Sequence, residues 1–228
     1  MRDREAVRER HRGTWRPSRI SIAASAFVLI LALAPPPAKA TETEAAMGFV
    51  RALGAETLRV LTDRDAQPAH RAARIRQLIS DNFDFWRIGR FVVGSAWRKA
   101  SQGQKGRFQA LFKTWLLDTY ARRLDGYGGE VFEVLDARPM GRRDVLVMTR
   151  IHRPGGKPVR AGWRLGTTSG RFRILDLVIE GMSMAVVQRA EFRTVIRRDG
   201  LDGLIETLAG RAAKAAASRQ RQLVLNRN

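Results

Sequence analysis

The sequence predicts a single α+β domain, in which helices pack on an antiparallel sheet of about four strands. Three observations support this prediction. The length of 228 residues suits one domain with a targeting segment. Apolar residues recur at helical spacing up to about residue 124 and again from residue 184 onward, whereas between residues 131 and 179 the period changes to two. Helices, then strands, then helices are typical of the α+β class.

The first forty residues are predicted to be a cleaved signal peptide. Seven arginines precede the apolar run Ile20–Ala34, and three prolines follow it. The next residues, Ala38, Lys39 and Ala40, form a small-x-small cleavage site, so we expect the mature chain to start at Thr41. The alternative is a retained anchor, but fifteen residues fall short of the roughly 20 that a membrane-spanning helix needs. We therefore expect an exported protein.

Four helices are predicted before residue 125. They span Ala45–Leu61, His70–Ser80 and Arg87–Val93, and the fourth extends from an N-cap at Ser101 to the glycines that begin at Gly126. In the fourth helix Phe108, Phe112 and Trp115 recur at positions i, i+4 and i+7, which gives it an apolar and aromatic face.

Four strands follow, joined by Gly and Pro turns that favour antiparallel pairing. They are predicted at Val131–Leu135, Asp144–His152, Pro158–Gly166 and Arg171–Ile179. In the second strand Val145 and Val147 point to one face and Leu146 to the other, so both faces are apolar. Such a sheet must be covered on both sides or must enclose something. Ordinary burial under helices is equally compatible with this pattern.

The last part of the chain is predicted to form two helices, Met184–Arg197 and a second one from Leu201 to about Ser218. An Ala- and Arg-rich stretch begins at Arg211. We expect residues 211–228 to be a basic tail, in which the helix frays and then becomes disordered.

Composition excludes several kinds of site. The chain has no cysteine, which excludes disulfides, thiolate metal sites and cysteine nucleophiles. Its histidines are not spaced as metal ligands, and no phosphate-binding glycine motif is present, so neither a metal nor a cofactor is expected.

The net charge of +20 favours anionic partners. Nucleic acid is not expected, because an exported protein rarely meets it. The basic residues predicted to dock an anionic membrane or an acidic protein are Arg90, Arg98, Arg122, Arg123, Arg142 and Arg143. The alternative is that these arginines are only solvated surface.

No catalytic residue is predicted. Gly181–Ala185 is one residue away from the G-x-S-x-G motif of serine hydrolases, but no histidine follows Ser183. We predict instead that Ser183 caps the following helix. Asp176 and Glu180 are a candidate acid–base pair, but a structural ion pair between Asp176 and an arginine is favoured.

The segment Arg171–Met184 contains the pattern D-x-x-x-E-G-x-S-M, and the G-L-D-G-L sequence at Gly200–Leu204 follows it. Upstream, Phe83–Phe85 and Phe91–Gly94 add an aromatic connector and a small-residue helix. Together these segments resemble the MlaC, or toluene-tolerance, family over about residues 45–210, which predicts a lipid-binding domain at residues 41–210. Met182 stands where the family usually has Val or Ile.

The resemblance implies a periplasmic carrier that holds phospholipid acyl chains in an apolar cavity between a curved sheet and helices, and that is not an enzyme. It also implies exchange of lipid with an inner-membrane ABC transporter complex and an outer-membrane lipoprotein complex, with only transient membrane contact through these partners. Burial of each CH₂ group is worth about 0.8 kcal/mol, so a carrier needs a large dry cavity. The candidate lining residues are Phe112, Trp115, Val147, Trp163, Leu177, Ile179, Met182, Met184 and Phe192. The alternatives are a carrier of another apolar lipid, such as a hopanoid, and a basic exported binding protein without a ligand.

Overall fold

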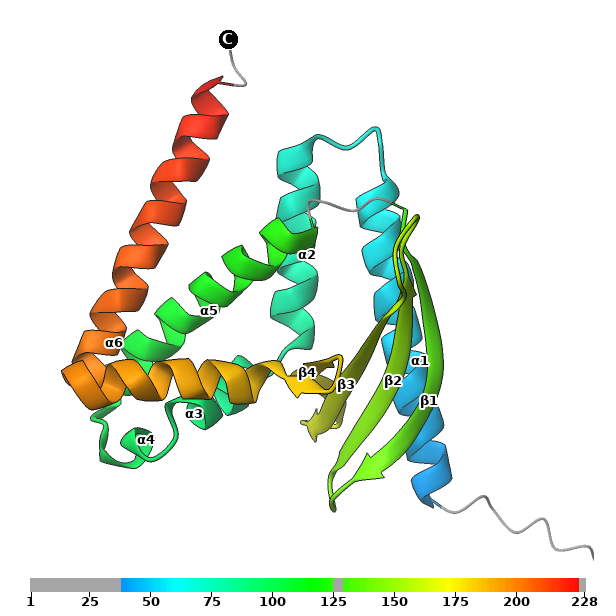
Figure 1. Ribbon diagram of the computed structural model, residues 1–228, viewed down its shortest axis with the longest axis horizontal. Helices are drawn as coiled ribbons and strands as arrows, with labels where there is room; N and C mark the ends of the chain where they lie inside the picture. Colours follow the sequence, from blue (N-terminus) through cyan, green and yellow to red (C-terminus); the bar gives the residue numbers. More distant parts are fainter. Residues whose placement is uncertain (1–37, 125–128, 226–228) are drawn as a thin grey trace, which may run out of the picture. The chain divides into compact units, whose positions relative to one another are not determined.

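Five helices precede the sheet in the computed structural model, which describes residues 38–124 and 129–225. They are α1 (Ala38–Thr62), α2 (Pro68–Asn82), α3 (Phe85–Val93), α4 (Ala96–Lys99) and α5 (Gln102–Leu124) (Figure 1). Four of them correspond to the predicted helices. The short α4 was not predicted, because four residues are too few to show a helical period.

Local hydrogen bonds define where several of these helices begin. Pro68 occupies the first turn of α2, where its missing N–H costs nothing. The carboxylate of Asp84 accepts a hydrogen bond from the Arg87 amide at 2.9 Å and caps α3. Ser101 Oγ accepts from the Gln104 amide at 3.1 Å, while Gln104 Oε1 accepts from the Ser101 amide at 2.9 Å. This reciprocal capping box confirms the predicted start of α5.

The sheet is antiparallel throughout, with the order β1-β2-β3-β4-β5. Its strands are β1 (Val131–Met140), β2 (Asp144–His152), β3 (Val159–Thr168), β4 (Arg171–Ile179) and β5 (Met182–Ser183). The α+β class is therefore confirmed, with five strands rather than about four. The extra strand, β5, is only two residues long and pairs with the end of β4.

Strand β1 is longer than predicted. We expected it to end at Leu135, but it continues to Met140. A bulge between Val134 and Asp136 shifts the pairing with β2, so the alternation of apolar residues is interrupted at that point. Pro139 also weakens the strand signal in the sequence, although an edge strand such as β1 tolerates proline.

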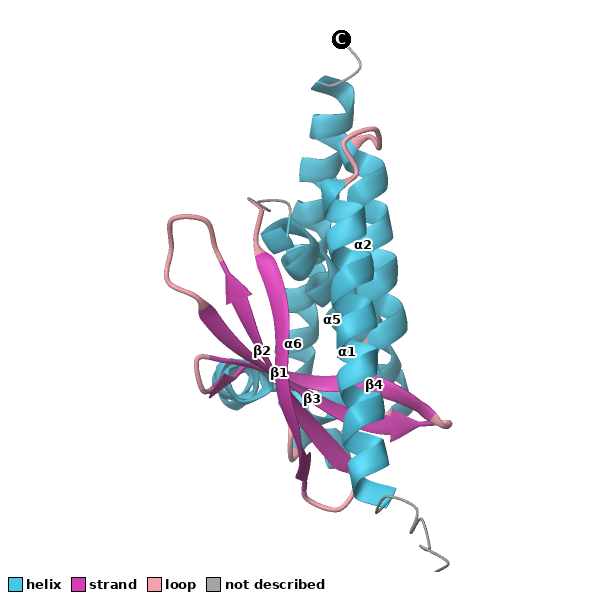
Figure 2. Ribbon diagram, turned by 90° about the vertical axis from the view of Figure 1, so that its right-hand side faces the viewer, coloured by secondary structure: helices cyan, strands magenta, loops and turns pink. Residues whose placement is uncertain are grey.

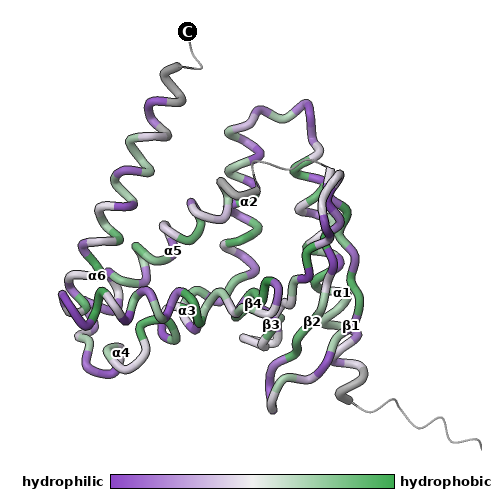
Figure 3. Tube along the Cα trace, viewed as in Figure 1, coloured by the Kyte–Doolittle hydropathy of each residue, from purple (hydrophilic) through white to green (hydrophobic). Residues whose placement is uncertain are grey.

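Two apolar cores hold the described residues together. In the first, α1 packs on β1 and β2, and Ala46 and Val50 meet Val145, Val147 and Leu165 (Figure 2). The second lies among α2, α3, α5 and α6, and its fully buried side chains include Phe108, Phe112, Leu204, Ile205 and Leu208. Figure 3 shows apolar and polar residues alternating along α5 and α6, as expected for helices that bury one face.

Helix α6 (Met184–Leu225) contains a sharp kink. Gly200 there has φ 72° and ψ −177°, so the chain forms two helical segments, in agreement with the two predicted helices. The second segment continues to Leu225, through most of the stretch for which we expected a fraying end and disorder. Its many alanines explain the difference, because alanine has the highest helix propensity.

Candidate functional site

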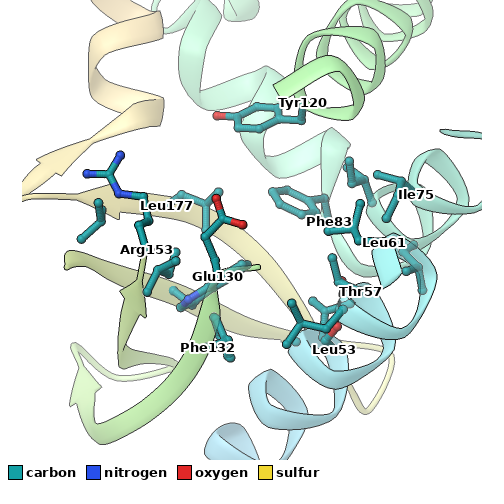
Figure 4. Close-up of a pocket in the computed structure, with 17 residues that line it drawn as sticks. Leu53, Thr57, Leu61, Ile75, Phe83, Tyr120, Glu130, Phe132, Arg153 and Leu177 are labelled. Atoms are coloured by element: carbon teal, nitrogen blue, oxygen red, sulfur yellow. Dashed lines mark hydrogen bonds between the residues drawn. The ribbon is translucent and has the colours of Figure 1, made fainter. Parts of the chain in front are cut away.

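A cavity of about 350 Å³ lies between α1, α2 and one face of the sheet (Figure 4). Its walls come from α1 and α2, from Tyr120 of α5, from four strands and from the connections between elements. The lining residues are Leu53, Gly54, Thr57, Leu58, Leu61, Ile75, Leu78, Ile79, Phe83, Tyr120, Glu130, Phe132, Ile151, Arg153, Val159, Trp163 and Leu177.

The sheet wall follows from strand register. Phe132 of β1 pairs with Ile151 of β2, and Trp163 of β3 pairs with Leu177 of β4. Residues paired across neighbouring strands point to the same face, so these side chains form one apolar surface. The rings of Phe132 and Trp163 meet edge to face, with their centroids 6.0 Å apart.

The helical wall depends on a close approach of α1 to the sheet. Leu53, Thr57 and Leu61 recur every four residues and therefore lie on one face of α1. A Cβ atom on Gly54 would come within 2.6 Å of the Phe132 ring. Glycine at this position lets α1 and Phe132 stay in contact.

The Thr57 hydroxyl and the Trp163 indole in the walls are hydrogen-bonded to other groups of the protein. Thr57 Oγ1 donates a hydrogen bond to the Leu53 carbonyl at 2.8 Å. The indole Nε1 of Trp163 donates to Thr149 Oγ1 at 3.0 Å, and that hydroxyl donates in turn to the Ala161 carbonyl at 2.9 Å. The walls therefore offer an apolar ligand a dry surface, while the two charged lining residues, Glu130 and Arg153, lie at strand ends.

A smaller cavity of about 50 Å³ adjoins the first. Phe83, Tyr120 and Leu177 line both cavities. The smaller one continues between α3, α5 and the start of α6, so displacement of these three shared side chains would join the two spaces.

The structure brings together some of the nine predicted lining residues. Trp163 and Leu177 line the larger cavity, and Phe112, Trp115, Leu177 and Met184 line the smaller one. Val147 and Phe192 are buried in the two solid cores. Ile179 and Met182 line neither cavity, and they pair with each other between β4 and β5.

Met182 is 59% exposed, which differs from the predicted position in an acyl-chain cavity. The reason is the turn that precedes it. Glu180 and Gly181 both have positive φ angles, 48° and 82°, and these reverse the chain beyond the end of β4. The prediction followed the apolar residues Leu177, Ile179, Met182 and Met184, whose spacing alone does not show this reversal at Glu180 and Gly181.

The residues that the sequence analysis missed come mainly from α1 and α2. Leu53, Leu58 and Leu61 repeat at helical spacing, as do Ile75, Leu78 and Ile79. This periodicity signals that the side chains leave water, but it is the same for a solid core and for a cavity wall.

The prediction that Ser183 caps the last helix is confirmed. Its Oγ accepts a hydrogen bond from the Val186 amide at 3.0 Å and donates to Asp176 Oδ2 at 2.5 Å. Asp176 Oδ1 accepts from the Ala185 amide at 2.9 Å. The predicted ion pair between Asp176 and an arginine is therefore wrong, since the start of α6 supplies the hydrogen-bond donors. His152 contacts Glu133 Oε2 at 3.0 Å and does not complete a serine-hydrolase arrangement.

The predicted docking arginines lie on several elements. Arg90 is on α3, Arg98 is on α4, and Arg142 and Arg143 form the turn between β1 and β2. All four are exposed, and none of them forms an ion pair with another residue of the described ranges. Arg122 and Arg123 are near the end of α5, where the side chains fall outside the described part of the protein.

Among residues 38–124 and 129–225, no helix is long and apolar enough to cross a membrane. The same residues contain no cluster of His, Cys, Asp or Glu that could hold a metal ion.

Two curated relatives are similar to part of the chain. One is the intermembrane phospholipid transport system binding protein MlaC of Haemophilus influenzae, which is 24% identical over 130 residues, or 55% of this chain and 61% of the relative. The other is the toluene tolerance protein ttg2D of Pseudomonas putida, 27% identical over 120 residues, or 52% of this chain and 56% of the relative. The chain thus spans less than two thirds of the length of either relative.

A solved structure has the same fold. It is the phospholipid-binding protein of Ralstonia solanacearum in complex with a phospholipid, which is 24% identical and has a TM-score of 0.65. The match covers 75% of this chain and 98% of the solved one. The family model described as MlaC protein matches residues 51–210, well over half of the sequence. This chain therefore belongs to the MlaC family.

Proposed function

We propose that this protein binds a phospholipid, with the acyl chains in the cavity between α1, α2 and the sheet. The observation that carries this proposal is the distribution of polar groups: the Thr57 hydroxyl and the Trp163 indole are hydrogen-bonded internally, and both charged lining residues lie at strand ends. Each CH₂ group that enters such a space gains about 0.8 kcal/mol. The volume of about 350 Å³ falls within the roughly 300–1,000 Å³ of small-molecule sites, and the adjoining cavity offers more space.

The relatives support a role in transport between membranes. We propose that the protein acts in the periplasm as a carrier without enzymatic activity, and that it exchanges lipid with an inner-membrane ABC transporter complex and an outer-membrane lipoprotein complex. The exposed arginines Arg90, Arg98, Arg142 and Arg143 are the proposed docking residues. The two relatives named for phospholipid transport and for toluene tolerance are consistent with this role.

The proposed role in the periplasm requires that residues 1–40 act as a targeting segment. We propose that residues 1–40 are removed, that residues 41–210 are the lipid-binding domain and that residues 211–228 form a basic tail. Cleavage after Ala40 would remove only the first three residues of α1 and would leave Ala46 and Val50 in contact with the sheet. N-terminal sequencing of the exported protein tests this proposal, and an intact Met1 would contradict it.

The lipid proposal is tested by organic extraction and mass spectrometry of natively purified protein. Leu177 lines both cavities, so Leu177→Glu should remove the bound lipid, because an ionised carboxylate in an apolar cavity costs several kcal/mol. Leu177→Met should retain lipid, since volume-conserving apolar changes cost less than about 1.5 kcal/mol. Met182→Glu is the matched control: this residue is exposed, and we expect normal lipid content.

Thermal unfolding on the same preparations separates loss of lipid from loss of fold. If Leu177→Glu does not fold, Thr57→Trp is a second test. It fills the cavity from α1 without adding charge, and it should lower the amount of bound lipid. Wild-type protein without any copurified lipid would overturn the proposal. If a hopanoid copurifies instead of a phospholipid, the cavity binds an apolar ligand but the ligand class is different.

A further inference from the structure

We propose that the outward side of α3 contacts an anionic lipid bilayer directly, with the exposed indole of Trp86 in the headgroup region. This inference goes beyond lipid binding, because it does not depend on what the cavities hold. Ile88 and Val92, on the inward side of the same helix, line the smaller cavity. Contact at α3 would therefore bring that cavity next to the bilayer.

Helix α3 has one buried side and one exposed side. The buried residues are Phe85, Ile88, Gly89, Val92 and Val93. The exposed residues are Trp86, Arg87, Arg90 and Phe91, and at 3.6 residues per turn these four lie on one side of the helix. Two large aromatic rings thus remain in water on one short helix, which is typical of a surface that contacts a partner.

The core holds Trp86 in place without covering it. Its ring meets the buried Trp97 edge to face, with the centroids 5.2 Å apart, and Trp97 in turn meets Phe108 at 6.3 Å. Gln109 Nε2 donates a hydrogen bond to the Trp86 carbonyl at 3.3 Å. Trp86 is nevertheless 53% exposed, so a large part of a fixed aromatic ring faces solvent.

Cations lie on both sides of this ring. Lys105 Nζ is 5.8 Å from the centre of the Trp97 ring, and Lys113 Nζ is 5.5 Å from the centre of the Phe85 ring. Both lysines come from one side of α5, because they are spaced four residues on either side of Gln109. Arg90 lies one turn beyond Trp86 on α3.

The second exposed ring also has a cation beside it. Helix α3 contacts α6 (Figure 1), and the guanidinium carbon of Arg189 on α6 lies 4.9 Å from the centre of the Phe91 ring. Each exposed aromatic ring of α3 is therefore accompanied by basic side chains.

No carboxylate in this part of the sequence offsets these cations. Residues 85–117 contain seven Lys or Arg and no Asp or Glu. Two of the seven, Arg87 and Arg107, pair with Asp144 and Glu206 from other elements. The remaining five form no ion pair within residues 38–124 and 129–225. Such a cluster attracts an anionic surface.

The composition of this surface favours a bilayer over an acidic protein. Lysine is depleted at protein–protein interfaces, whereas each lysine near an anionic membrane strengthens binding. Tryptophan is enriched at the depth of the lipid headgroups, where its ring is partly in an apolar medium and its N–H stays close to water. Trp86 between Lys105 and Lys113 combines these two features.

The first experiment measures whether Trp86 reaches the lipid. The protein is mixed with saturating vesicles of phosphatidylcholine and phosphatidylglycerol that carry ordinary or brominated acyl chains, because bromine quenches tryptophan fluorescence on contact. We expect a smaller quenched fraction in Trp86→Phe than in the wild-type protein. Trp97→Phe is the control, since it removes a buried indole and should not lower the quenched fraction.

Quenching by lipid inside the cavities is separable from this effect. Trp163 lines the larger cavity and Trp115 the smaller one, so lipid taken up there quenches the same indoles in the wild-type protein and in Trp86→Phe. Only the difference between the two proteins reports on Trp86. The proposed lipid-binding function can therefore fail or hold independently of the contact at α3.

The second experiment measures cosedimentation with phosphatidylglycerol vesicles. Trp86→Ala should weaken binding about tenfold, because about half of a large aromatic surface would no longer leave water. Lys113→Gln should weaken it about fivefold at low salt. Raising the salt concentration should reduce the effect of Lys113→Gln, since exposed charges are screened, but not that of Trp86→Ala.

The chain offers a control for each change. Val131→Ala shortens an apolar side chain that is 61% exposed and lies beside His152 at one end of β2, whereas α3 reaches the other end through Arg87 and Asp144. Arg107→Gln removes an exposed cation that is paired with Glu206. We expect both controls to bind vesicles nearly as the wild-type protein does.

Three results would overturn the contact at α3. The first is equal quenching of the wild-type protein and Trp86→Phe, and the second is wild-type binding of Trp86→Ala to the vesicles. Either is the result expected if this surface binds an acidic protein instead. The third is an equal loss of binding in Val131→Ala, because exposed apolar surface anywhere on the protein would then have the same effect.

Discussion

At the scale of single residues, Glu56 links the first two helices. Its Oε1 lies 2.8 Å from Arg59 Nη2 on α1 and 3.0 Å from Arg74 Nη2 on α2. Hydrogen bonds from Arg59, and then from Arg74, lower the pKa of the Glu56 carboxyl from 4.5 to about 2. The folded protein therefore favours the ionised carboxylate more strongly than the unfolded chain does.

This linkage predicts how stability depends on pH. Since the folded pKa lies below the unfolded one, the contribution of Glu56 is fully present above about pH 4.5 and is lost as the pH falls toward about 2. Glu56→Gln should lower the melting temperature slightly at pH 7, because exposed pairs contribute little. The difference in melting temperature between the variant and the wild type should vanish as the pH falls from about 4.5 to about 2. Arg74→Gln should show part of the same loss, since Arg59 remains. A difference in melting temperature that does not change with pH would contradict this account.

The turn from β4 to α6 shows what a short motif encodes. Asp176 and Ser183 accept hydrogen bonds from the amides of Ala185 and Val186, and the carboxylate of Glu180 accepts one from the Arg160 amide at 2.7 Å. Gly181 adopts a positive φ. The D-x-x-x-E-G-x-S pattern is thus explained by helix capping and turn formation. The cap by Ser183 was predictable from its place before a helix, but the role of Asp176 was not, because the turn creates its contact.

At the scale of elements, the kink in α6 depends on a glycine. Gly200 has φ 72° and ψ −177°, a region that is essentially restricted to glycine. Gly210 lies within the second segment of α6, and a Cβ atom there would have no neighbour within 4 Å. The two positions differ in backbone conformation although both are glycines of one helix.

These two glycines form a matched pair of variants. Gly200→Ala should destabilise the protein by about 1–3 kcal/mol, because it places a side chain in a strained backbone conformation. Gly210→Ala should stabilise it by about 0.5–1 kcal/mol, because alanine loses less conformational entropy in a helix. Urea unfolding of both variants measures the two effects. Equal and small changes would show that the kink does not require glycine.

Prediction of the elements succeeded where the pattern was long and regular. The helices around Phe49, Ile75 and Phe108 were predictable, as were β2 and β4, because their apolar residues keep one period throughout. The prediction of the elements was incomplete where the period is interrupted or absent. The bulge at Val134 and Asp136 hid the second half of β1, and the two residues of β5 form a strand only because the turn brings them back to β4.

At the scale of the whole described unit, the cavity follows from how α1 and α2 are placed on the sheet. The first part of α1 closes on the strands through Ala46 and Val50, while Leu53, Leu58 and Leu61 face a space that side chains do not fill. Sequence pattern identifies which residues leave water, but a void depends on the distances between elements. This is why Trp163 and Leu177 were found from the sequence, whereas the lining of α1 and α2 was not.

The distribution of charge leads to the last prediction. Eight of the arginines in the described ranges form ion pairs with carboxylates, whereas the proposed docking residues Arg90, Arg98, Arg142 and Arg143 are exposed and form none within those ranges. At physiological ionic strength, charges act over only about 8 Å. Unpaired arginines should therefore contribute more to docking on an anionic surface than paired ones do.

Two sets of four Arg→Gln changes test this, with the same change in net charge. One set replaces the four proposed docking arginines, and the control replaces the ion-paired Arg59, Arg107, Arg150 and Arg198. Each Lys or Arg near an anionic membrane contributes about 1 kcal/mol, so the docking set should weaken cosedimentation with phosphatidylglycerol vesicles at least about tenfold, and the control set less. Lipid content should be unchanged in both. Equal loss in the two sets would mean that net charge alone drives binding, because position on the surface would then have no effect.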